Sequence, residues 1–233
     1  GYTGTEAVFE GKEGFMDCFG PDWDTEKLVG NLGERFKILD CSMKAFPTEA
    51  LTHTHISCVL KAVTENDIKP EDIDQVIVTT IARACDILFD PHKYRPDSRE
   101  TADHSLPYCI AVAIVDRKVT TQSFSAEKMK DPRIWEVIDK IKGEASEEFE
   151  KMFPAKQPSK VVVRTKDGKA YSASLDYPKG DPRQPMTEDE LRIKFNSLAQ
   201  GWLSEEKQKE VETLIFGCEK HSAREFMQGL VVE

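Results

Sequence analysis

The sequence has no apolar run long enough to cross a membrane. Its most hydrophobic stretch is YCIAVAIV at residues 108–115, whereas a transmembrane helix needs about 20 apolar residues. The first residues, GYTGTEAVFEGKEG, show no basic segment followed by an apolar one, so we expect no signal peptide there. The sequence also begins without Met, which is typical of a piece of a longer protein or of a chain matured by cleavage.

Cysteines are present, but they are not clustered. No two are close enough to form a CxxC pair, and the spacings of zinc ribbons and common iron–sulfur proteins are absent. Scattered cysteines in a chain of this size are typical of a reducing compartment. We therefore expect a cytoplasmic protein, or one of the mitochondrial matrix if the source is eukaryotic. The cysteines are Cys18, Cys41, Cys58, Cys85, Cys109 and Cys218.

An excess of basic residues is also lacking, since the formal net charge is −10. This argues against a protein that binds duplex nucleic acid, which needs a concentrated basic surface. A local group of Lys, Arg and His can still hold a small anion inside an acidic protein. The nucleotide-binding, zinc-protease and hydrolase motifs GxGxxG, GxxxxGK[ST], HExxH and GxSxG are absent as well.

The chain has 233 residues, of which 39% are hydrophobic and 32% charged, so it is typical of one large or two small globular domains. Apolar periodicity predicts helices, and alternating β-branched residues predict strands. The expected helices are residues 24–36, 48–66, 98–118 (with a break possible at Pro107), 131–143, 188–202 and 204–220; the expected strands are 75–81 and a hairpin over 159–177, and residues 86–98 are an expected loop.

These elements predict an α+β fold. A mixed domain of helices and an antiparallel hairpin occupies residues 37–182, and more helical segments, residues 1–36 and 183–233, flank it. The flanking segments look like parts of a separate helical domain that the middle interrupts.

A first candidate site surrounds the AFP break in the sequence MKAFPTEALTHTH. Lys44 precedes the break and Glu49 follows it, and a lysine at the junction of a loop and a helix suits an anionic substrate. His53 and His55 are two residues apart and do not share a helix face, so we expect no paired metal site. The plain structural alternative is a surface lysine, a helix-capping glutamate and two histidines on a helix surface.

The second candidate is ETADHSLPY, residues 100–108. Asp103 or Ser105 is a suitable helix cap, His104 a proton donor or charge partner, and Tyr108 a hydrogen-bond donor or acid. The structural alternative is a capped helix with a half-buried tyrosine. A third group is either an anion pocket or a solvated loop, and consists of Arg83, His92, Lys93, Arg95 and Arg99.

Read as a whole, RETADHSLPYCIAVAIVDRKVT resembles a signature of the MmgE/PrpD family, the 2-methylcitrate dehydratases. That signature has an acid-His-Ser-Leu-Pro-Tyr core followed by AVALxDG, and here Arg117 stands in place of the glycine. The stretches MKAFPTEALTH, GYTGTEAVFEGKEGF and TEDELRIKF are also similar to family segments.

The resemblance implies an α+β lid that is inserted before the last helices of a large all-helical domain. This sequence matches the lid and those last helices, and it lacks nearly all of the N-terminal helical domain. That domain is therefore an expected partner, either in the same protein or on a separate chain. The resemblance further implies a homodimer, with no partnership with nucleic acid or membrane.

The implied activity is elimination of water from 2-methylcitrate in propionate breakdown, without a cofactor or metal. By the same resemblance, Lys44 meets the carboxylates of the tricarboxylate substrate, and the catalytic group consists of Tyr108, His104 and Glu49. Glu49 falls where cis-aconitate decarboxylases have an active-site histidine, which weighs against decarboxylation. The alternatives are a cis-aconitate decarboxylase, an iminodisuccinate epimerase, or a non-catalytic subunit or interaction module of a split enzyme.

Overall fold

The computed structural model describes residue 1 and residues 3–231, and it divides into two compact units, Gly1–Cys41 and Ser42–Glu233. The first unit contains α1 (Phe15–Phe19), α2 (Thr25–Val29) and the 3-10 helix η1 (Lys37–Asp40), none of which has a buried residue. The helix expected over 24–36 is thus much shorter than predicted. Asp24 caps it, and it ends where Gly30, Asn31 (φ 62°) and Gly33 (φ 84°) leave the helical conformation.

The second unit is built on a four-stranded mixed sheet with the order β2-β1-β3-β4. Its strands are β1 (Ile73–Thr80), β2 (Ile141–Ala145), β3 (Ser159–Thr165) and β4 (Ala170–Leu175). β1 runs parallel to β2 and antiparallel to β3, and β3 is antiparallel to β4. Alternate residues of β1 and β3 are buried, so one face of the sheet carries the core.

The predicted hairpin is confirmed, with Gly168 at φ 84° in the turn between β3 and β4. The prediction for 131–143 is wrong in its second half, because α7 ends at Ile138 and the following residues form β2. Ile141 is buried opposite Val76 of β1, and this pairing overrides the local helical period. The expected loop at 86–98 also contains the end of α4 (Ala82–Leu88) and η4 (Pro91–Tyr94).

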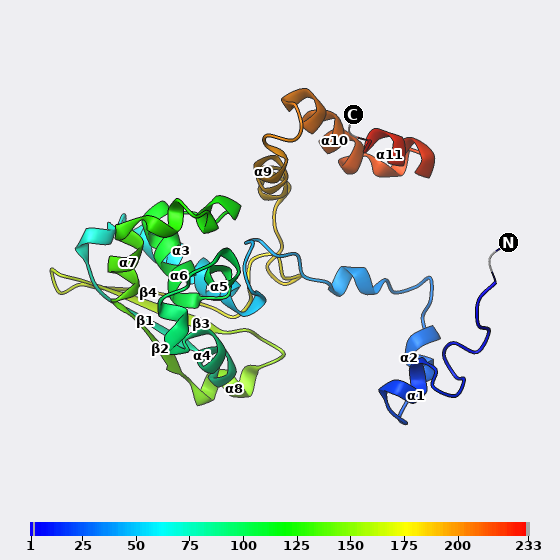
Figure 1. Cartoon of the computed structure of the whole chain (residues 1–233), viewed down its shortest axis with the longest axis horizontal. Coiled ribbons are helices and arrows are strands. Elements are labelled where there is room, and N and C mark those ends of the chain that lie inside the picture. The colour runs from blue at the N-terminus through cyan, green and yellow to red at the C-terminus, as the bar shows by residue number, and fades with distance from the viewer. Residues whose placement is uncertain (2, 232–233) are drawn as a thin grey trace. The chain divides into compact units, whose positions relative to one another are not determined.

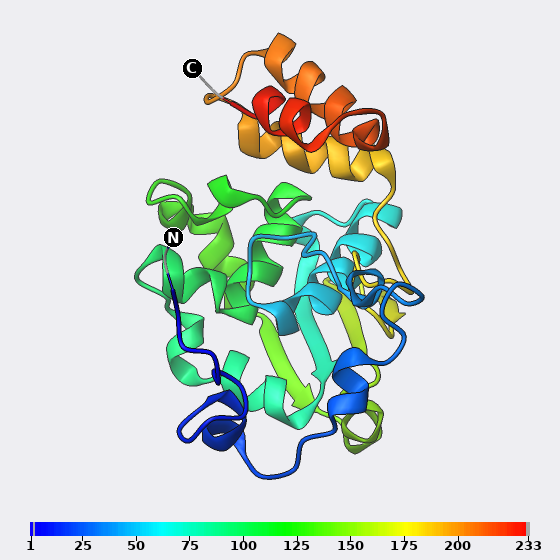
Figure 2. The same cartoon turned by 90° about the vertical axis from the view of Figure 1, so that its right-hand side faces the viewer.

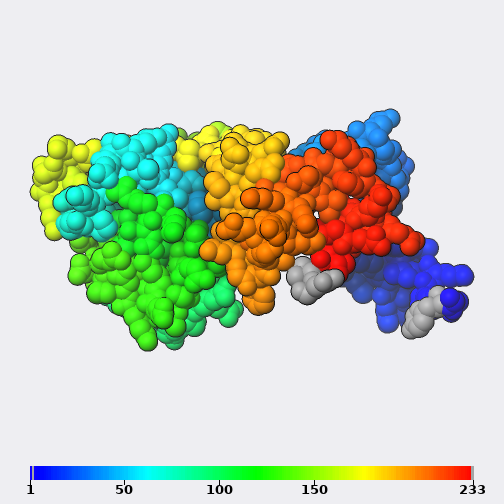
Figure 3. Space-filling view, turned by 90° about the horizontal axis from the view of Figure 1, so that it is seen from above, coloured from blue at the N-terminus to red at the C-terminus, as the bar shows by residue number. Residues whose placement is uncertain are grey.

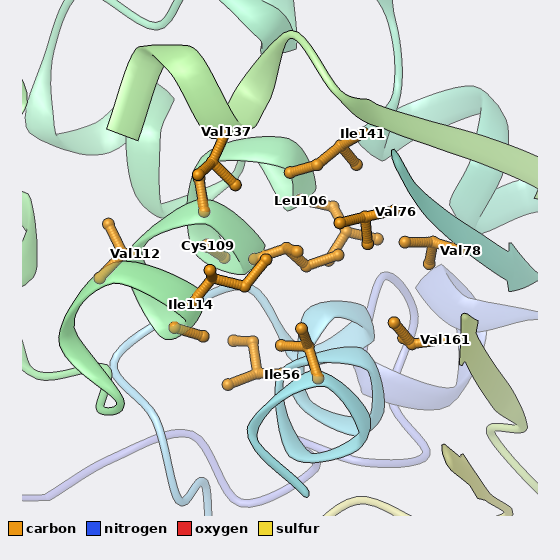
Figure 4. Packing of buried hydrophobic residues seen from close by; sticks show 14 of the residues in the cluster. Ile56, Val76, Val78, Leu106, Cys109, Val112, Ile114, Val137, Ile141 and Val161 are labelled. Atoms are coloured by element: carbon orange, nitrogen blue, oxygen red, sulfur yellow. The ribbon is translucent and has the colours of Figure 1, made fainter. Parts of the chain in front are cut away.

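The helices α3 (His53–Glu65), α6 (Leu106–Asp116) and α7 cover one face of the sheet (Figure 1). Side chains from these helices and from β1, β2 and β3 meet in one hydrophobic core (Figure 4). The residues labelled there are Ile56, Val76, Val78, Leu106, Cys109, Val112, Ile114, Val137, Ile141 and Val161. The segment before α3 forms a 3-10 turn, η2 (Ala50–Thr52).

The helix expected over 98–118 is two helices, α5 (Arg99–Asp103) and α6, with the break at His104 and Ser105. Ser98 caps α5. Ser105 caps α6 by accepting a hydrogen bond from the Tyr108 amide, and Pro107 lies in the first turn. Of the two expected caps, the structure therefore selects Ser105 rather than Asp103.

The remaining elements are short helices in the connections of the second unit and the α-helices after β4. Figure 2 shows α9 (Glu188–Ala199), α10 (Glu205–Phe216) and α11 (Ala223–Gly229) gathered in one group, in gold to red. The predicted capping box of Thr187 and Glu190 opens α9. The other elements are η3 (Pro70–Asp72), η5 (Thr121–Phe124), η6 (Lys128–Lys130), α8 (Glu147–Met152) and η7 (Cys218–Lys220).

The α+β fold class is confirmed. The described helices are all too short or too polar to traverse a lipid bilayer. The boundaries at 36/37 and 182/183, between helical ends and lid, stay predictions.

Candidate functional site

Lys44 lines a cavity of about 260 Å³, called here the basic pocket, within the second unit. Three segments far apart in the sequence form its wall: residues 42–53, the loop before β3 and the loop after β4. Its cationic lining residues are Lys44, Lys156, Lys179 and Arg183, against one carboxylate, Asp181. This local excess of positive charge is the kind of group that holds a small anion in an acidic protein.

Three of the four cations already have a carboxylate partner. Lys156 Nζ lies 2.6 Å from Asp176 Oδ2, and Lys179 Nζ lies 2.7 Å from a Glu190 oxygen. Arg183 binds Asp181 through two nitrogens, at 2.8 and 2.9 Å, and its guanidinium stacks on a tyrosine ring 3.9 Å away. These ion pairs fix the loops that shape the pocket, and they neutralise much of its charge.

Lys44 is different, because no carboxylate of the described residues forms an ion pair with it. Its Nζ donates a hydrogen bond to the Thr48 carbonyl at 2.7 Å. The Lys44 carbonyl in turn accepts a hydrogen bond from Lys194 Nζ of α9 at 2.5 Å. The Lys44 ammonium is therefore oriented by a neutral group, and its charge is left to attract an anion.

His53 also lines the basic pocket, at the first residue of α3. It is 2% exposed, and its Nε2 lies 3.4 Å from the Thr48 carbonyl to which Lys44 donates. Burial, with smaller contributions from the charges of Lys44 and Lys194, lowers the pKa of His53 to about 4. The imidazole is therefore neutral at pH 7 and adds hydrogen-bonding capacity without charge.

The structural alternative in which both histidines lie on a helix surface does not hold, since both are buried. His55 is 3% exposed, and burial lowers its pKa to about 4. Its Nδ1 lies 2.9 Å from the Leu51 carbonyl. The residues described contain no group of three or more His, Cys, Asp and Glu side chains that could hold a metal ion.

Glu49 lies outside the wall of the basic pocket. Its carboxylate accepts a hydrogen bond from the Leu51 amide at 2.6 Å and so caps η2. Its own amide donates to the Asp103 carbonyl at 3.1 Å, which ties this turn to the end of α5. In this conformation Glu49 acts as a cap, and its catalytic role stays a prediction.

The structure does not bring His104 and Tyr108 to the basic pocket. The His104 side chain is 51% exposed and its Nδ1 lies 2.5 Å from Asp103 Oδ1. Tyr108 is fully buried, and its hydroxyl donates to the Ser123 carbonyl at 2.8 Å. Burial raises the pKa of the Tyr108 phenol. Tyr108 is a core residue here, and the catalytic roles of these two side chains stay predictions.

The anion pocket considered for the basic residues between positions 83 and 99 is separate from the basic pocket and stays a prediction. None lines the basic pocket, and Arg95 is paired with Asp139 at 2.6 Å. The sequence reasoning instead missed Lys156, Lys179 and Arg183. They lie in connections on either side of the hairpin, and only the pairing of β3 with β4 brings those connections together.

A comparison with known proteins shows the family of the chain. The family model described as MmgE/PrpD C-terminal domain matches residues 46–216. The chain belongs to the MmgE/PrpD family.

Named relatives of this MmgE/PrpD chain are cis-aconitate decarboxylases. The enzyme of Aspergillus terreus is 23% identical over 239 residues, which cover 94% of this chain and 48% of the relative. That of Mus musculus is 26% identical over 188 residues, covering 78% of this chain and 36% of the relative. The cis-aconitate decarboxylase-like protein oryM of Aspergillus oryzae is 25% identical, covering 94% and 48%. The chain thus spans half or less of these relatives' length.

One position where this MmgE/PrpD chain differs from the family signature is structurally explained. Arg117 follows α6 in the left-handed conformation, φ 56°, in which glycine is favoured. Its guanidinium donates to the carbonyls of Val63 and Ile68 and lies 3.6 Å from Asp67. The arginine therefore joins the end of α6 to the end of α3.

Proposed function

We propose that this chain forms one wall of the active site of a lyase that acts on a tricarboxylate, and that Lys44 holds a substrate carboxylate. The observation that carries this proposal is the position of Lys44, the one cation of the basic pocket without an ion-pair partner among the described residues. Membership of the MmgE/PrpD family supports it.

The reaction that the named relatives favour is decarboxylation of cis-aconitate. In that step the bond between a carbon and its carboxylate breaks and CO₂ leaves. The electron pair of that bond forms a new double bond to the neighbouring carbon, while the pair of the original double bond moves to its outer carbon, where an acid protonates it, giving itaconate. The ammonium of Lys44 would neutralise a carboxylate that the product retains, and neutral His53 would donate or accept a hydrogen bond beside it. The proton donor belongs to the part of the enzyme outside this chain.

A second candidate is dehydration of 2-methylcitrate, and Glu49 favours it. By family resemblance this position holds an active-site histidine in cis-aconitate decarboxylases, and here a glutamate stands in its place. In a dehydration a base removes a proton beside a carboxylate while the neighbouring hydroxyl leaves as water, which forms a double bond. Dehydration, like decarboxylation, needs a cation beside a substrate carboxylate.

Product identification separates these candidates. The full-length protein is incubated separately with cis-aconitate and 2-methylcitrate, and mass spectrometry follows the products. Itaconate with release of CO₂ supports the decarboxylase, and 2-methylaconitate supports the dehydratase. If correctly folded full-length protein neither converts nor binds any tricarboxylate, the lyase proposal fails, and a non-catalytic subunit becomes the better account.

The partners follow from the same proposal. The relatives are about twice as long as this chain or longer, so we propose that a further helical domain supplies the opposite wall of the site. A homodimer is part of the proposal, and light scattering on the full-length protein tests it.

A further inference from the structure

Lys44 also borders a second and larger cavity of about 620 Å³, called here the amphipathic cavity. It lies between α9 and the earlier part of the same unit. In Figure 3 the gold surface of α9 meets the cyan and green surfaces of that earlier part. A cavity of this size is in the range that takes ligands larger than a six-carbon acid.

The wall of the amphipathic cavity is largely apolar. Residues before α3, within α3, after α6 and along α9 contribute to it: Phe46, Pro47, Leu60, Val119, Ile193 and Leu198. Ile193 and Leu198 are 69% and 49% exposed, so their apolar surface is available to a ligand. A purely polar tricarboxylate gains nothing from such a wall, whereas a hydrocarbon chain gains free energy from every methylene group that it buries.

The rim of the same cavity is cationic. Lys44, Lys118 and Lys194 line it, and none of the three has an ion-pair partner among residues 3–231. Lys179 also lines the cavity but is paired with Glu190. Lys194 Nζ contacts the Lys44 carbonyl, so Lys44 and Lys194 are neighbours in the cavity wall, beside its apolar residues.

From this juxtaposition we infer that the substrate is an alkyl-substituted tricarboxylate with a chain longer than methyl. Its carboxylates bind Lys44 and Lys194, and its alkyl chain lies along Ile193 and Leu198 in the amphipathic cavity. Lys194 is then a substrate-binding residue on α9. This inference rests on the proposed function, since it names the substrate class of the same site.

Calorimetric titration of the full-length protein tests the inference with citrate, 2-methylcitrate, 2-butylcitrate and octanoate. Each added methylene group is expected to lower Kd roughly three- to fourfold, so 2-butylcitrate, with four more such groups, binds at least about eightyfold more tightly than citrate. The variants Ile193→Asn and Leu198→Asn remove most of this difference in affinity between 2-butylcitrate and citrate. Ile215→Asn is the matched control, because Ile215 is 44% exposed on α10 and does not line the cavity.

Each other outcome has a defined meaning. Equal affinity for citrate and 2-butylcitrate overturns this inference but leaves the proposed function standing. Octanoate binding as tightly as 2-butylcitrate also overturns it, because the site would then recognise a fatty acid. If none of the tricarboxylates binds, the proposed function fails together with the inference. Lys194→Met should weaken every tricarboxylate by a similar factor without changing the gain per methylene group.

Discussion

The two buried histidines at the start of α3 make the stability of this unit depend on pH. His53 and His55 have pKa values of about 4 in the folded chain, against 6.5 in an unfolded one. The unfolded chain therefore binds more protons between these values, so folding becomes less favourable as the pH falls from 6.5 toward 4. Above pH 6.5 the contribution is fully present.

Denaturant unfolding at pH 7.5 and pH 4.5 measures this effect. Each histidine is expected to cost about 2 kcal/mol of unfolding free energy at the lower pH. The variant His55→Gln should lose less stability on acidification than the unaltered chain, by about that amount. An identical pH dependence in the variant and the unaltered chain would contradict the burial of His55.

Substitution of Tyr108 distinguishes a structural role of this residue from a catalytic one. Its buried hydroxyl is committed to the Ser123 carbonyl, so Tyr108→Phe should lower the unfolding free energy by about 1–2 kcal/mol. We expect kcat/KM to change less than about threefold, since the residue does not line the basic pocket. A large fall in kcat with unchanged stability would instead support the catalytic role that the family resemblance implies.

At the level of single residues, the sequence predicted part of the candidate site. Lys44 is recognisable because it precedes a proline break and a helix start. Arg183 and Lys156 carry no such signal, since each is an ordinary loop cation until the hairpin brings the two loops together. The burial of His53 was also out of reach, because it depends on packing with Phe46, whose ring lies 5.5 Å away.

At the level of helices and strands, the side chain of Arg117 joins the end of α6 to the end of α3. Arg117→Ala loses the hydrogen bonds to Val63 and Ile68 and keeps the left-handed backbone, so we expect a loss of about 2–3 kcal/mol. Arg117→Gly loses the same bonds but removes the left-handed penalty, and should be about 1 kcal/mol less destabilised than the alanine variant. Thermal and denaturant unfolding compare the two. Equal losses would mean that the backbone at this position is not strained.

Elements with a strong local signal were predicted well. The β3–β4 hairpin has alternating residues and a glycine turn, and α9 has a capping box. β2 was missed because its residues IKGEA lack a strand pattern, and only pairing with β1 makes them a strand. The 98–118 segment was expected to be one helix because its apolar residues keep the helical period on both sides of Ser105. In the structure Ser105 is instead the N-cap at which a second helix, α6, begins.

For the whole molecule, the first unit contributes no buried side chain from its helices. Removal of residues 1–41 should therefore change the melting temperature of the second unit by less than about 2 °C, because no core is lost. Differential scanning calorimetry on the two chains measures this. A much larger fall would show that the first unit stabilises the rest of the chain.

The large exposed apolar side chains gather at the two ends of the sequence. They include Phe19, Leu32 and Leu39 in the first unit and Trp202 and Met227 near the C-terminus, of which Trp202 is 85% exposed. Contiguous exposed apolar surface usually marks a protein interface. This fits a chain that spans half or less of its relatives' length, and it supports the proposal that a further helical domain completes the site.

The central claim is that the unpaired ammonium of Lys44 holds a substrate carboxylate, and kcat/KM of the full-length protein carrying Lys44→Met tests it most directly. Loss of a charge-assisted contact predicts a fall of about ten- to hundredfold on the substrate that the product analysis identifies. The matched control Lys160→Met, an exposed lysine of β3 outside the pocket, should stay within about twofold of the unaltered protein. Unchanged kcat/KM in the Lys44→Met variant would contradict the account.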